Sequence, residues 1–264
     1  MEEEFQTDIL LNGNQIIQSK NTFMYGIDAV LLADFVRTQI HKTDSYIDIC
    51  SGNGIIPLLL TDVVEKITAL EIQTEIAEMA KKSMELNNLE NRISVINGDL
   101  KKVEGFFSKH SFNCVSCNPP YMINQHGRQN SLDAKTIARH EVLCNLEDVI
   151  SAADYLLHSH GKFFMVHRPF RLPEIFFAMK NHGLEPKRMR LIQPFENTEP
   201  NLVLIEARKD ANPSLEIEKS LIVREKNGEY TEEVKKIYQK LSNTGGIKKN
   251  VIPNKVQNDV MQFS

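Results

Sequence analysis

The chain has 264 residues, of which 41% are hydrophobic and 25% charged, values typical of a globular protein and not of a disordered chain. A formal net charge of −4 excludes a globally basic nucleic-acid binder but leaves room for a local basic patch. The sequence has no apolar run near the roughly 18 residues of a membrane span, and its acidic start, Met1–Glu4, is unlike a signal peptide. Because its four cysteines are interpreted as reduced thiols, we expect a cytoplasmic protein.

The predicted elements begin with a polar stretch over residues 1–22 and an amphipathic helix over 28–40, for which Asp28 is the expected N-cap. Strands and helices then alternate as far as residue 182. The predicted strands are 45–50, 66–72, 93–97, 112–117 and 162–167, and the predicted helices are 55–64, 73–89, 146–158 and 172–181. This alternation indicates a parallel sheet with helices on both faces.

The C-terminal part departs from this alternation. Two further strands, 187–193 and 202–208, follow each other without a helix, so we expect one of them to be antiparallel. Residues 221–223 are expected to pair at a sheet edge, and a helix is predicted over 231–241. We predict a single domain over 1–241, which divides into a lead-in and cap (1–44), an α/β core (45–210) and a strand–helix extension (211–241), with a flexible tail over 242–264.

The first candidate site is the turn after the first core strand, which reads Asp48-Ile49-Cys50-Ser51-Gly52-Asn53-Gly54. Its glycines let the backbone approach a ligand at the carboxyl edge of the sheet, where α/β proteins bind cofactors. Glu71 closes the next strand, where a carboxylate can accept hydrogen bonds from both ribose hydroxyls. Asp99 follows the third strand and can accept from an adenine amino group. Together these residues favour a nucleoside-containing cofactor. Pro57 stands where a nicotinamide-binding fingerprint would have its third glycine, which counts against a nicotinamide cofactor.

The second candidate site is Asn118-Pro119-Pro120-Tyr121, directly after the fourth strand. The two prolines remove two N–H donors and bias Asn118 toward an extended conformation, which leaves nearby carbonyl groups to accept from a ligand. The Asn118 side chain adds an acceptor, and Tyr121 adds a ring on which a planar base can stack. Two acceptors that hold the N–H bonds of a conjugated amine out of plane would localise its lone pair. This pattern is typical of methyl transfer to an amino group.

With these motifs the sequence resembles the class I S-adenosylmethionine-dependent amino methyltransferases, and more narrowly the tRNA1(Val) (adenine-N6) methyltransferase family. The narrower resemblance covers about residues 5–240 and is carried by these segments: Phe23–Leu32, Ile55–Leu60, Glu71–Gln73, Arg139–Glu141 and Val166–Pro169. It implies a Rossmann-like α/β fold with a seven-stranded, mostly parallel sheet. It also implies S-adenosyl-L-methionine as the cofactor and adenine 37 in the anticodon loop of tRNA1(Val) as the target.

The resemblance implies a role for each matching residue. The target base would be held by the proposed catalytic residues Asn118, Pro119, Pro120 and Tyr121. The cofactor would be bound by Asp28, Asp48, Cys50, Ser51, Gly52, Asn53, Gly54, Glu71, Ile72, Asp99, Leu100 and Asn118. Tyr25 belongs with Asp28 to the segment expected to close the methionine end. Cys50 stands where the family usually has its first glycine, so its thiol is expected to narrow the methionine pocket.

An acidic chain needs local cations to bind RNA. The polar stretch 122–144 has no clear period and is interpreted as a long functional loop. The residues expected to contact RNA are Arg128, Lys135, Arg139, His140 and Arg168, with further basic groups at Arg171 and over 187–190. An anticodon-loop base is already single-stranded, so splaying it out costs little. The expected partner is tRNA, and neither a membrane nor an oligomer is implied.

Other interpretations stay open at this point. Within the same chemistry, the acceptor could be a protein glutamine, or an adenine in rRNA or DNA. In other classes, the chain could be an NAD-dependent oxidoreductase or a non-catalytic RNA-binding module. Cys114 and Cys117 have metal-like spacing, but positions three apart on a strand face opposite sides, so no metal site is expected.

Overall fold

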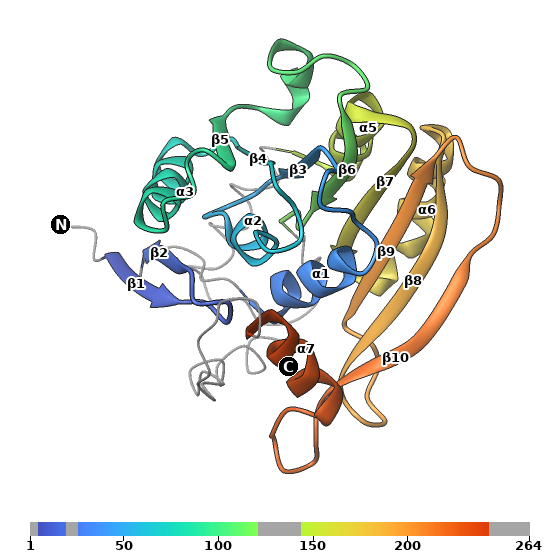
Figure 1. Cartoon of the computed structure of the whole chain (residues 1–264). Coiled ribbons are helices and arrows are strands. Elements are labelled where there is room, and N and C mark those ends of the chain that lie inside the picture. The colour runs from blue at the N-terminus through green and yellow to red at the C-terminus, as the bar shows by residue number, and fades with distance from the viewer. Residues whose placement is uncertain (1–4, 20–25, 121–143, 243–264) are drawn as a thin grey trace, which may run out of the picture.

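The computed structural model describes residues 5–19, 26–120 and 144–242 (Figure 1). The strands are β1 (Phe5–Ile9), β2 (Gln15–Ser19), β3 (Tyr46–Ile49), β4 (Ile67–Glu71), β5 (Ile93–Asn97), β6 (Phe112–Cys117), β7 (Leu157–His167), β8 (Leu184–Phe195), β9 (Leu202–Lys209) and β10 (Glu216–Arg224). The α-helices are α1 (Ile27–Arg37), α2 (Ile55–Leu59), α3 (Thr74–Leu86), α5 (Leu146–Leu156), α6 (Leu172–Asn181) and α7 (Glu232–Ser242), with 3₁₀ turns η1 (Leu100–Gly105) and η2 (Pro169–Arg171).

The main sheet has the strand order β10-β8-β9-β7-β6-β3-β4-β5. Strands β3 to β7 are mutually parallel, so their carboxyl ends lie at one edge. As expected, one of the later strands is antiparallel: β9 runs opposite to both of its neighbours, β7 and β8. The Rossmann-like α/β fold is confirmed, but the described sheet has eight strands and not seven, because β10 pairs along the outer edge of β8.

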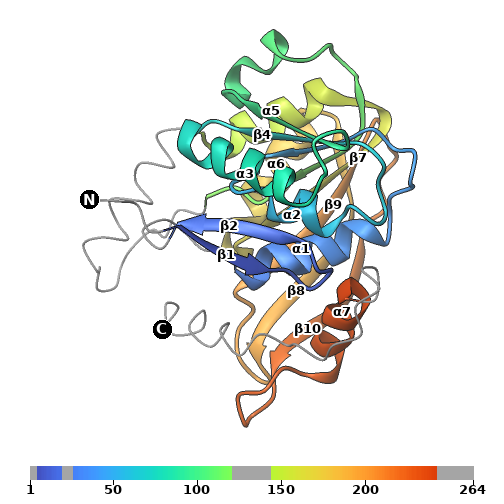
Figure 2. The same cartoon turned by 60° about the vertical axis from the view of Figure 1, so that its left-hand side comes forward.

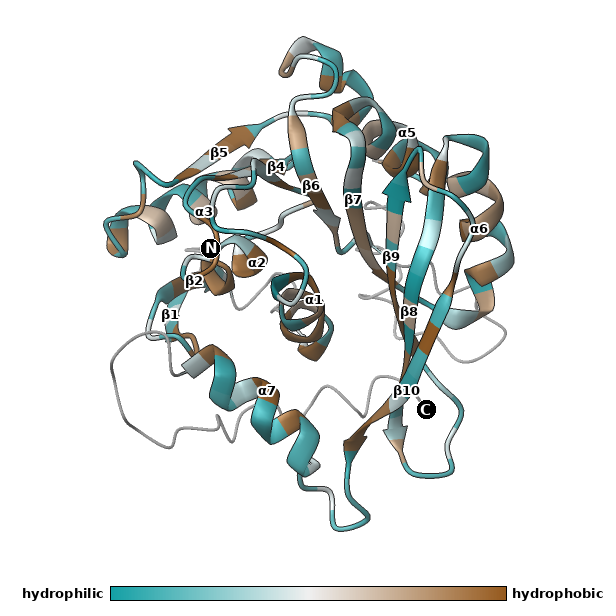
Figure 3. Ribbon diagram, turned by 45° about the vertical axis from the view of Figure 1, so that its right-hand side comes forward, coloured by the Kyte–Doolittle hydropathy of each residue, from teal (hydrophilic) through white to brown (hydrophobic). Residues whose placement is uncertain are grey.

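Two hydrophobic cores lie on opposite faces of this sheet. Helices α1, α2 and α7 contribute to one core, and α5, α6 and η1 to the other. The buried strands are apolar because both faces are covered; all four residues of β3 are buried. Figure 3 shows hydrophobic residues along the central strands and on α1. Cys114 belongs to one core and Cys117 to the other, which confirms that the two thiols cannot share one ion.

A hairpin of β1 and β2 packs beside α3 (Figure 2), where the sequence predicted only a polar stretch. The Ile17 N–H donates to Ser83 Oγ at 2.9 Å, so Ser83 is buried. Along α3, Ala77, Ala80 and Met84 are buried, whereas Leu86 is 44% exposed at the end of the helix. The hairpin therefore covers part of α3 through β2, while β4 and β5 also contact this helix.

Several predicted boundaries shift. The helix predicted over 55–64 ends at Leu59, because turns closed by the Leu60 carbonyl occupy the following residues. Strand β7 begins at Leu157, directly after α5, and not at residue 162. Among the residues described, no helix is both long and apolar enough to cross a membrane. The predictions for Tyr25, Tyr121, 122–143 and 243–264 lie outside the described residues.

Candidate active site

The predicted cofactor residues meet at the carboxyl edge of the sheet. The glycine turn follows β3, Glu71 ends β4, Asp99 follows β5 and Asn118 follows β6 (Figure 1). Because Ile49 pairs with Cys117 in the register of β3 and β6, the glycine turn and Asn118 leave the sheet side by side. The topology thus gathers both candidate sites at one place.

The glycine turn has the backbone shape that its composition predicted. Gly52 has φ +57° and Gly54 has φ +83°, a region that glycine adopts at no steric cost. A Cβ on Gly52 would meet no described atom within 4 Å, so a ligand can approach the backbone there. A Cβ on Gly54 would lie 2.6 Å from Met84 Cε, the end of a flexible side chain on α3 that can shift, so the positive φ is the main reason for glycine at this position.

Glu71 is 5% exposed, and its carboxylate is oriented by backbone donors. The Gly52 N–H donates to Oε2 at 2.9 Å, and the Gln73 N–H donates to Oε1 at 2.9 Å. A carboxylate has about four acceptor positions, so two backbone bonds leave capacity for ribose hydroxyls. Glu71 thereby joins the glycine turn to the end of β4.

The other cofactor residues lie along the same edge. Asp99 caps η1, since its Oδ1 accepts from the Lys101 N–H at 3.0 Å. Leu100 is buried in the core on the α5 side, and Ile72 and Asn53 are half-buried. A glycine turn open to a ligand and an acid at each of the next two strand ends fit a nucleoside-containing cofactor.

Asp48 is 1% exposed and is hydrogen-bonded within its own chain. Ser51 Oγ donates to Oδ2 at 2.7 Å, Ser116 Oγ donates to Oδ1, and Tyr46 Oη donates to Ser116 Oγ at 2.5 Å. Burial raises the pKa of Asp48 from 3.8 to about 7, although the two serine hydrogen bonds oppose the shift. Asp48 therefore stabilises the turn through buried hydrogen bonds. Sequence reasoning missed Ser116 and Tyr46; a serine in an otherwise buried strand was the available signal.

We expect Asp48→Asn to change how stability depends on pH. With a native pKa above that of the unfolded chain, Asp48 makes the native state bind more protons between about pH 4 and 7. Its stabilising contribution is therefore complete at low pH and is lost as the pH rises toward 7. Relative to the wild type, Asp48→Asn should gain stability over this interval in urea unfolding measured at several pH values. If the free energies of unfolding of the two proteins changed with pH in parallel, the titration of Asp48 would not contribute to stability.

Cys50 has an unusual backbone conformation for a residue with a side chain. Its φ is +56°, in the left-handed region that favours glycine, which agrees with the glycine that the resemblance implies at this position. The thiol packs against the core on the α5 side, with its Sγ 3.8 Å from Cys144 Sγ. The neighbouring thiol of Cys117, and then burial, raise the pKa of Cys50 well above its usual value, although the Cys144 thiol opposes the shift. The expected narrowing of the methionine pocket stays a prediction.

Asn118 and Pro119 emerge from β6 at the site, and Pro119 is buried. Asn118 Nδ2 donates to Asp28 Oδ2 at 3.1 Å, a contact between residues 90 positions apart. The prediction that Asp28 is the N-cap of α1 is wrong. The helix begins at Ile27, one residue before the predicted start, and Gly26 takes the cap position. Asp28 instead lies in the first turn of α1, where its Oδ1 accepts from the Ala29 N–H at 2.9 Å.

The described basic residues are mostly engaged in the protein itself. Arg168 is 9% exposed and donates to the Asn201 carbonyl at 3.0 Å, so it joins β7 to the β8–β9 turn and does not present an open cation. Its neighbour His167 is neutral, because burial and the charges of Arg171 and Arg168 lower its pKa to about 4. Arg188 and Arg190 pair with acidic residues along β10 and α7. The expected basic cluster over 187–190 is therefore structural.

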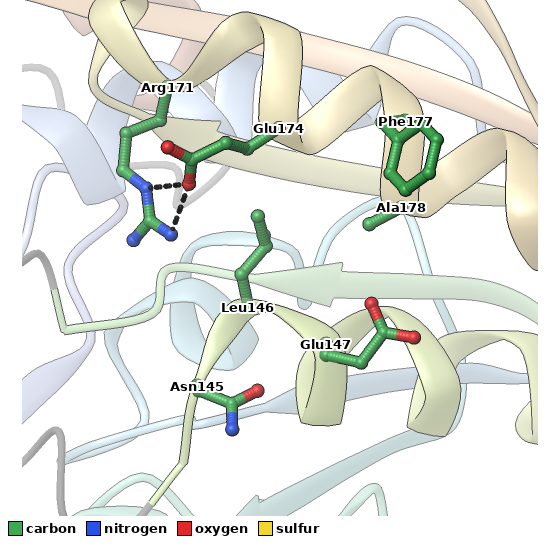
Figure 4. Close-up of a pocket in the computed structure, with 7 residues that line it drawn as sticks. All are labelled: Asn145, Leu146, Glu147, Arg171, Glu174, Phe177 and Ala178. Carbon is green, nitrogen blue, oxygen red and sulfur yellow. Dashed lines mark hydrogen bonds and ion pairs between the residues drawn. The ribbon is translucent and has the colours of Figure 1, made fainter.

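A cleft of about 420 Å³ lies between the N-terminal ends of α5 and α6 (Figure 4). Leu146 points from α5 toward α6, and an ion pair of 2.6 Å joins Arg171 and Glu174 at one side. None of the residues predicted to bind cofactor or base lines this cleft. It is distinct from the candidate active site.

The part of the chain that contains this site matches a known protein family. Residues 19–180 match the model of the methyltransferase small domain, which is more than half of the chain. This chain belongs to the methyltransferase small domain family. The matched segment runs from β2 to α6 and thus includes the glycine turn, Glu71, Asp99 and Asn118.

Curated relatives of this methyltransferase are similar over most of its length. A protein of Flavobacterium johnsoniae is 26% identical over 85% of this chain and 96% of its own. A protein of Porphyromonas gingivalis is 26% identical over 71% of this chain and 75% of its own. Both are named tRNA1(Val) (adenine(37)-N6)-methyltransferase.

Solved structures agree on the fold of this methyltransferase. A predicted O-methyltransferase of Agrobacterium tumefaciens has a TM-score of 0.65 and 24% identity, over 85% of this chain and all of that one. The 16S rRNA N2 G1207 methyltransferase of Thermus thermophilus, in complex with AdoMet and guanosine, has a TM-score of 0.55 and 14% identity, over 79% of this chain and 51% of that one. These likenesses establish the methyltransferase fold.

Proposed function

We propose that this protein transfers a methyl group from S-adenosyl-L-methionine to the N6 atom of an adenine in tRNA, with adenine 37 of tRNA1(Val) as the target. The observation that carries the proposal is the position of Asn118-Pro119 at the carboxyl end of β6, directly beside the glycine turn and fixed to α1 through Asp28. The names of the curated relatives support the same acceptor.

The cofactor would bind along the edge formed by β3, β4 and β5. Glu71 would accept from the ribose hydroxyls, Gly52 would leave room for close backbone contact, and Asp99 would accept from the adenine amino group. S-adenosyl-L-methionine supplies an electrophilic methyl group on a sulfonium. Among the described residues no cluster of side chains is suited to hold a metal ion, and the proposal requires none.

The chain contributes positioning and hydrogen-bond acceptors to the transfer. The exocyclic amine of adenine is a weak nucleophile, because its lone pair is delocalised into the ring. Asn118 Oδ1 and a neighbouring backbone carbonyl would accept its two N–H bonds and so favour a tetrahedral nitrogen. The proton becomes acidic as the methyl group arrives, so a strong general base is not required. Tyr121, outside the described residues, would stack on the base.

The proposed partner is tRNA, and the proposed location is the cytoplasm. The predicted RNA contacts Arg128, Lys135, Arg139 and His140 lie outside the described residues, and they stay predictions. Since Arg168 is buried against the β8–β9 turn, we propose that it shapes the site and does not bind phosphate. We therefore propose that the predicted RNA contacts come from the segment that follows Pro120.

The proposed function is tested by supplying labelled S-adenosyl-L-methionine with three separate acceptors: unmodified tRNA, duplex DNA and protein. Digestion and separation of the products should give N6-methyladenosine from tRNA alone, and the Asn118→Ala variant serves as the control. Label in glutamine would show a protein methyltransferase, and label in DNA would move the target to another nucleic acid. Calorimetry that detected no cofactor binding would favour the non-catalytic RNA-binding module.

A further inference from the structure

The target amine requires an acceptor from Asn118, but a carboxamide presents two similar ends. Rotation by 180° about its last bond would exchange the oxygen acceptor for an NH₂ donor at nearly the same place. A donor facing the amine would bind its lone pair and oppose methyl transfer. Pro119 and Pro120 hold no N–H groups with which the following backbone could select one rotamer. Something else must therefore select the orientation of Asn118.

Asp28 makes that selection. Its Oδ2 lies 3.1 Å from Asn118 Nδ2, and its Oδ1 accepts from the Ala29 N–H at 2.9 Å. A carboxylate only accepts hydrogen bonds, so the Asn118 atom that faces it must be the NH₂ group. The oxygen of Asn118 is then directed away from Asp28.

The surroundings of Asp28 make this anchor rigid. Asp28 is buried in the first turn of α1, and the residues that follow it, from Ala29 to Val36, are buried as well. Helix α1 packs against β7 and α2, so the carboxylate has a fixed position relative to the end of β6. Precision of this kind matters, because a small misplacement of a reacting group is costly.

We propose that Asp28 is a positioning residue that orients the Asn118 carboxamide for catalysis and does not act mainly as a cofactor ligand. This proposal rests on the proposed amino methyltransferase function. It predicts a loss of turnover at saturating cofactor and tRNA, with the affinity for cofactor retained.

The test compares Asp28→Ala, Asp28→Asn and a matched control, Asp34→Ala. Asp34 lies on the same helix, is also buried, and pairs with Lys240 at 3.5 Å. For Asp28→Ala we expect kcat to fall roughly 10- to 100-fold, with the Kd for S-adenosyl-L-methionine and the KM for tRNA within about threefold. Asp28→Asn can present either an acceptor or a donor to Asn118, so its kcat should lie between those of Asp28→Ala and the wild type. Asp34→Ala should leave kcat within about twofold.

A double-mutant cycle separates positioning from other roles. In an Asn118→Ala background, Asp28→Ala should cost no further activity, because the group it orients is already absent. If the activity of the double variant were lower by the product of the two single losses, the proposal would be overturned. A Kd for cofactor raised more than tenfold with kcat unchanged at saturation would also overturn it, and would assign Asp28 to the methionine pocket.

Failure of the proposed function is distinguishable from failure of this inference. The side-chain amide resonances of Asn118 report the hydrogen bond without turnover, and they should move in Asp28→Ala and not in Asp34→Ala. If the wild type methylates another acceptor, the same cycle is measured with that acceptor. Unmoved Asn118 resonances in Asp28→Ala would overturn the positioning role, whatever the acceptor.

Discussion

Asn118→Ala is expected to lower kcat for tRNA methylation by roughly 100- to 1000-fold, about 3–4 kcal/mol of transition-state stabilisation. The loss follows because the side chain supplies an acceptor aimed at the attacking amine, where charge develops as the methyl group transfers. Cofactor binding should persist, since Glu71 and the glycine turn hold their geometry through their own hydrogen bonds. Single-turnover methylation of unmodified tRNA and calorimetric titration with S-adenosyl-L-methionine measure the two effects separately.

Asn113→Ala is the matched control for this experiment. Asn113 lies on the same strand, β6, at the end opposite Asn118, and its Oδ1 accepts from the Ser45 N–H at 2.9 Å. It should alter stability slightly and leave kcat unchanged. Equal activity of Asn118→Ala and the wild type would exclude Asn118 from the chemistry and remove the main support for the proposed function.

Arg188→Met is expected to lower the free energy of unfolding by about 3–5 kcal/mol, because it leaves a buried carboxylate without its main partner. Arg188 Nε lies 3.0 Å from Glu206 Oε2, and Glu206 is 3% exposed on β9. The same guanidinium lies 3.0 Å from Glu218 on β10 and stacks 3.9 Å from the centre of the Phe35 ring on α1. One side chain thus joins β8, β9, β10 and α1.

Two further variants test this interpretation by urea unfolding. Lys180→Met removes the ion pair with Glu185, in which the lysine side chain is 51% exposed, and it should cost less than about 1 kcal/mol. Adding Glu206→Leu to Arg188→Met removes the uncompensated charge and should recover part of the loss. A cost for Arg188→Met as small as that for Lys180→Met would show that water relieves the buried charge.

Much of the site could be predicted from the sequence, because its parts obey local rules. A glycine turn, an acid ending the next strand and Asn-Pro-Pro after a fourth strand depend on backbone preferences within a few residues. Parallel strands then bring their carboxyl ends to one edge, so order along the chain becomes proximity in space. The strands over 93–97 and 112–117 and the helix over 172–181 match the structure for the same reason.

Contacts between distant residues could not be predicted in this way. Arg188 looked available for RNA, because a sequence does not show that β9 and β10 place Glu206 and Glu218 beside it. Asp28 looked like a helix cap, and only the packing of α1 against the sheet brings it to Asn118. Likewise, the sequence does not show that the backbone of Cys50 is left-handed or that its Sγ lies 3.8 Å from Cys144 Sγ.

The sequence by itself determined the fold class and the gathering of the glycine turn, Glu71, Asp99 and Asn118 at one edge of the sheet, since strand–helix alternation and turn residues act over short stretches of chain. The pairing expected for residues 221–223 is present in β10, but only the tertiary structure decided the burial of Arg168 and the support of Asp48 by Ser116 and Tyr46. The physical reason is that hydrogen bonds and ion pairs between residues far apart in sequence depend on packing, which local preferences do not encode.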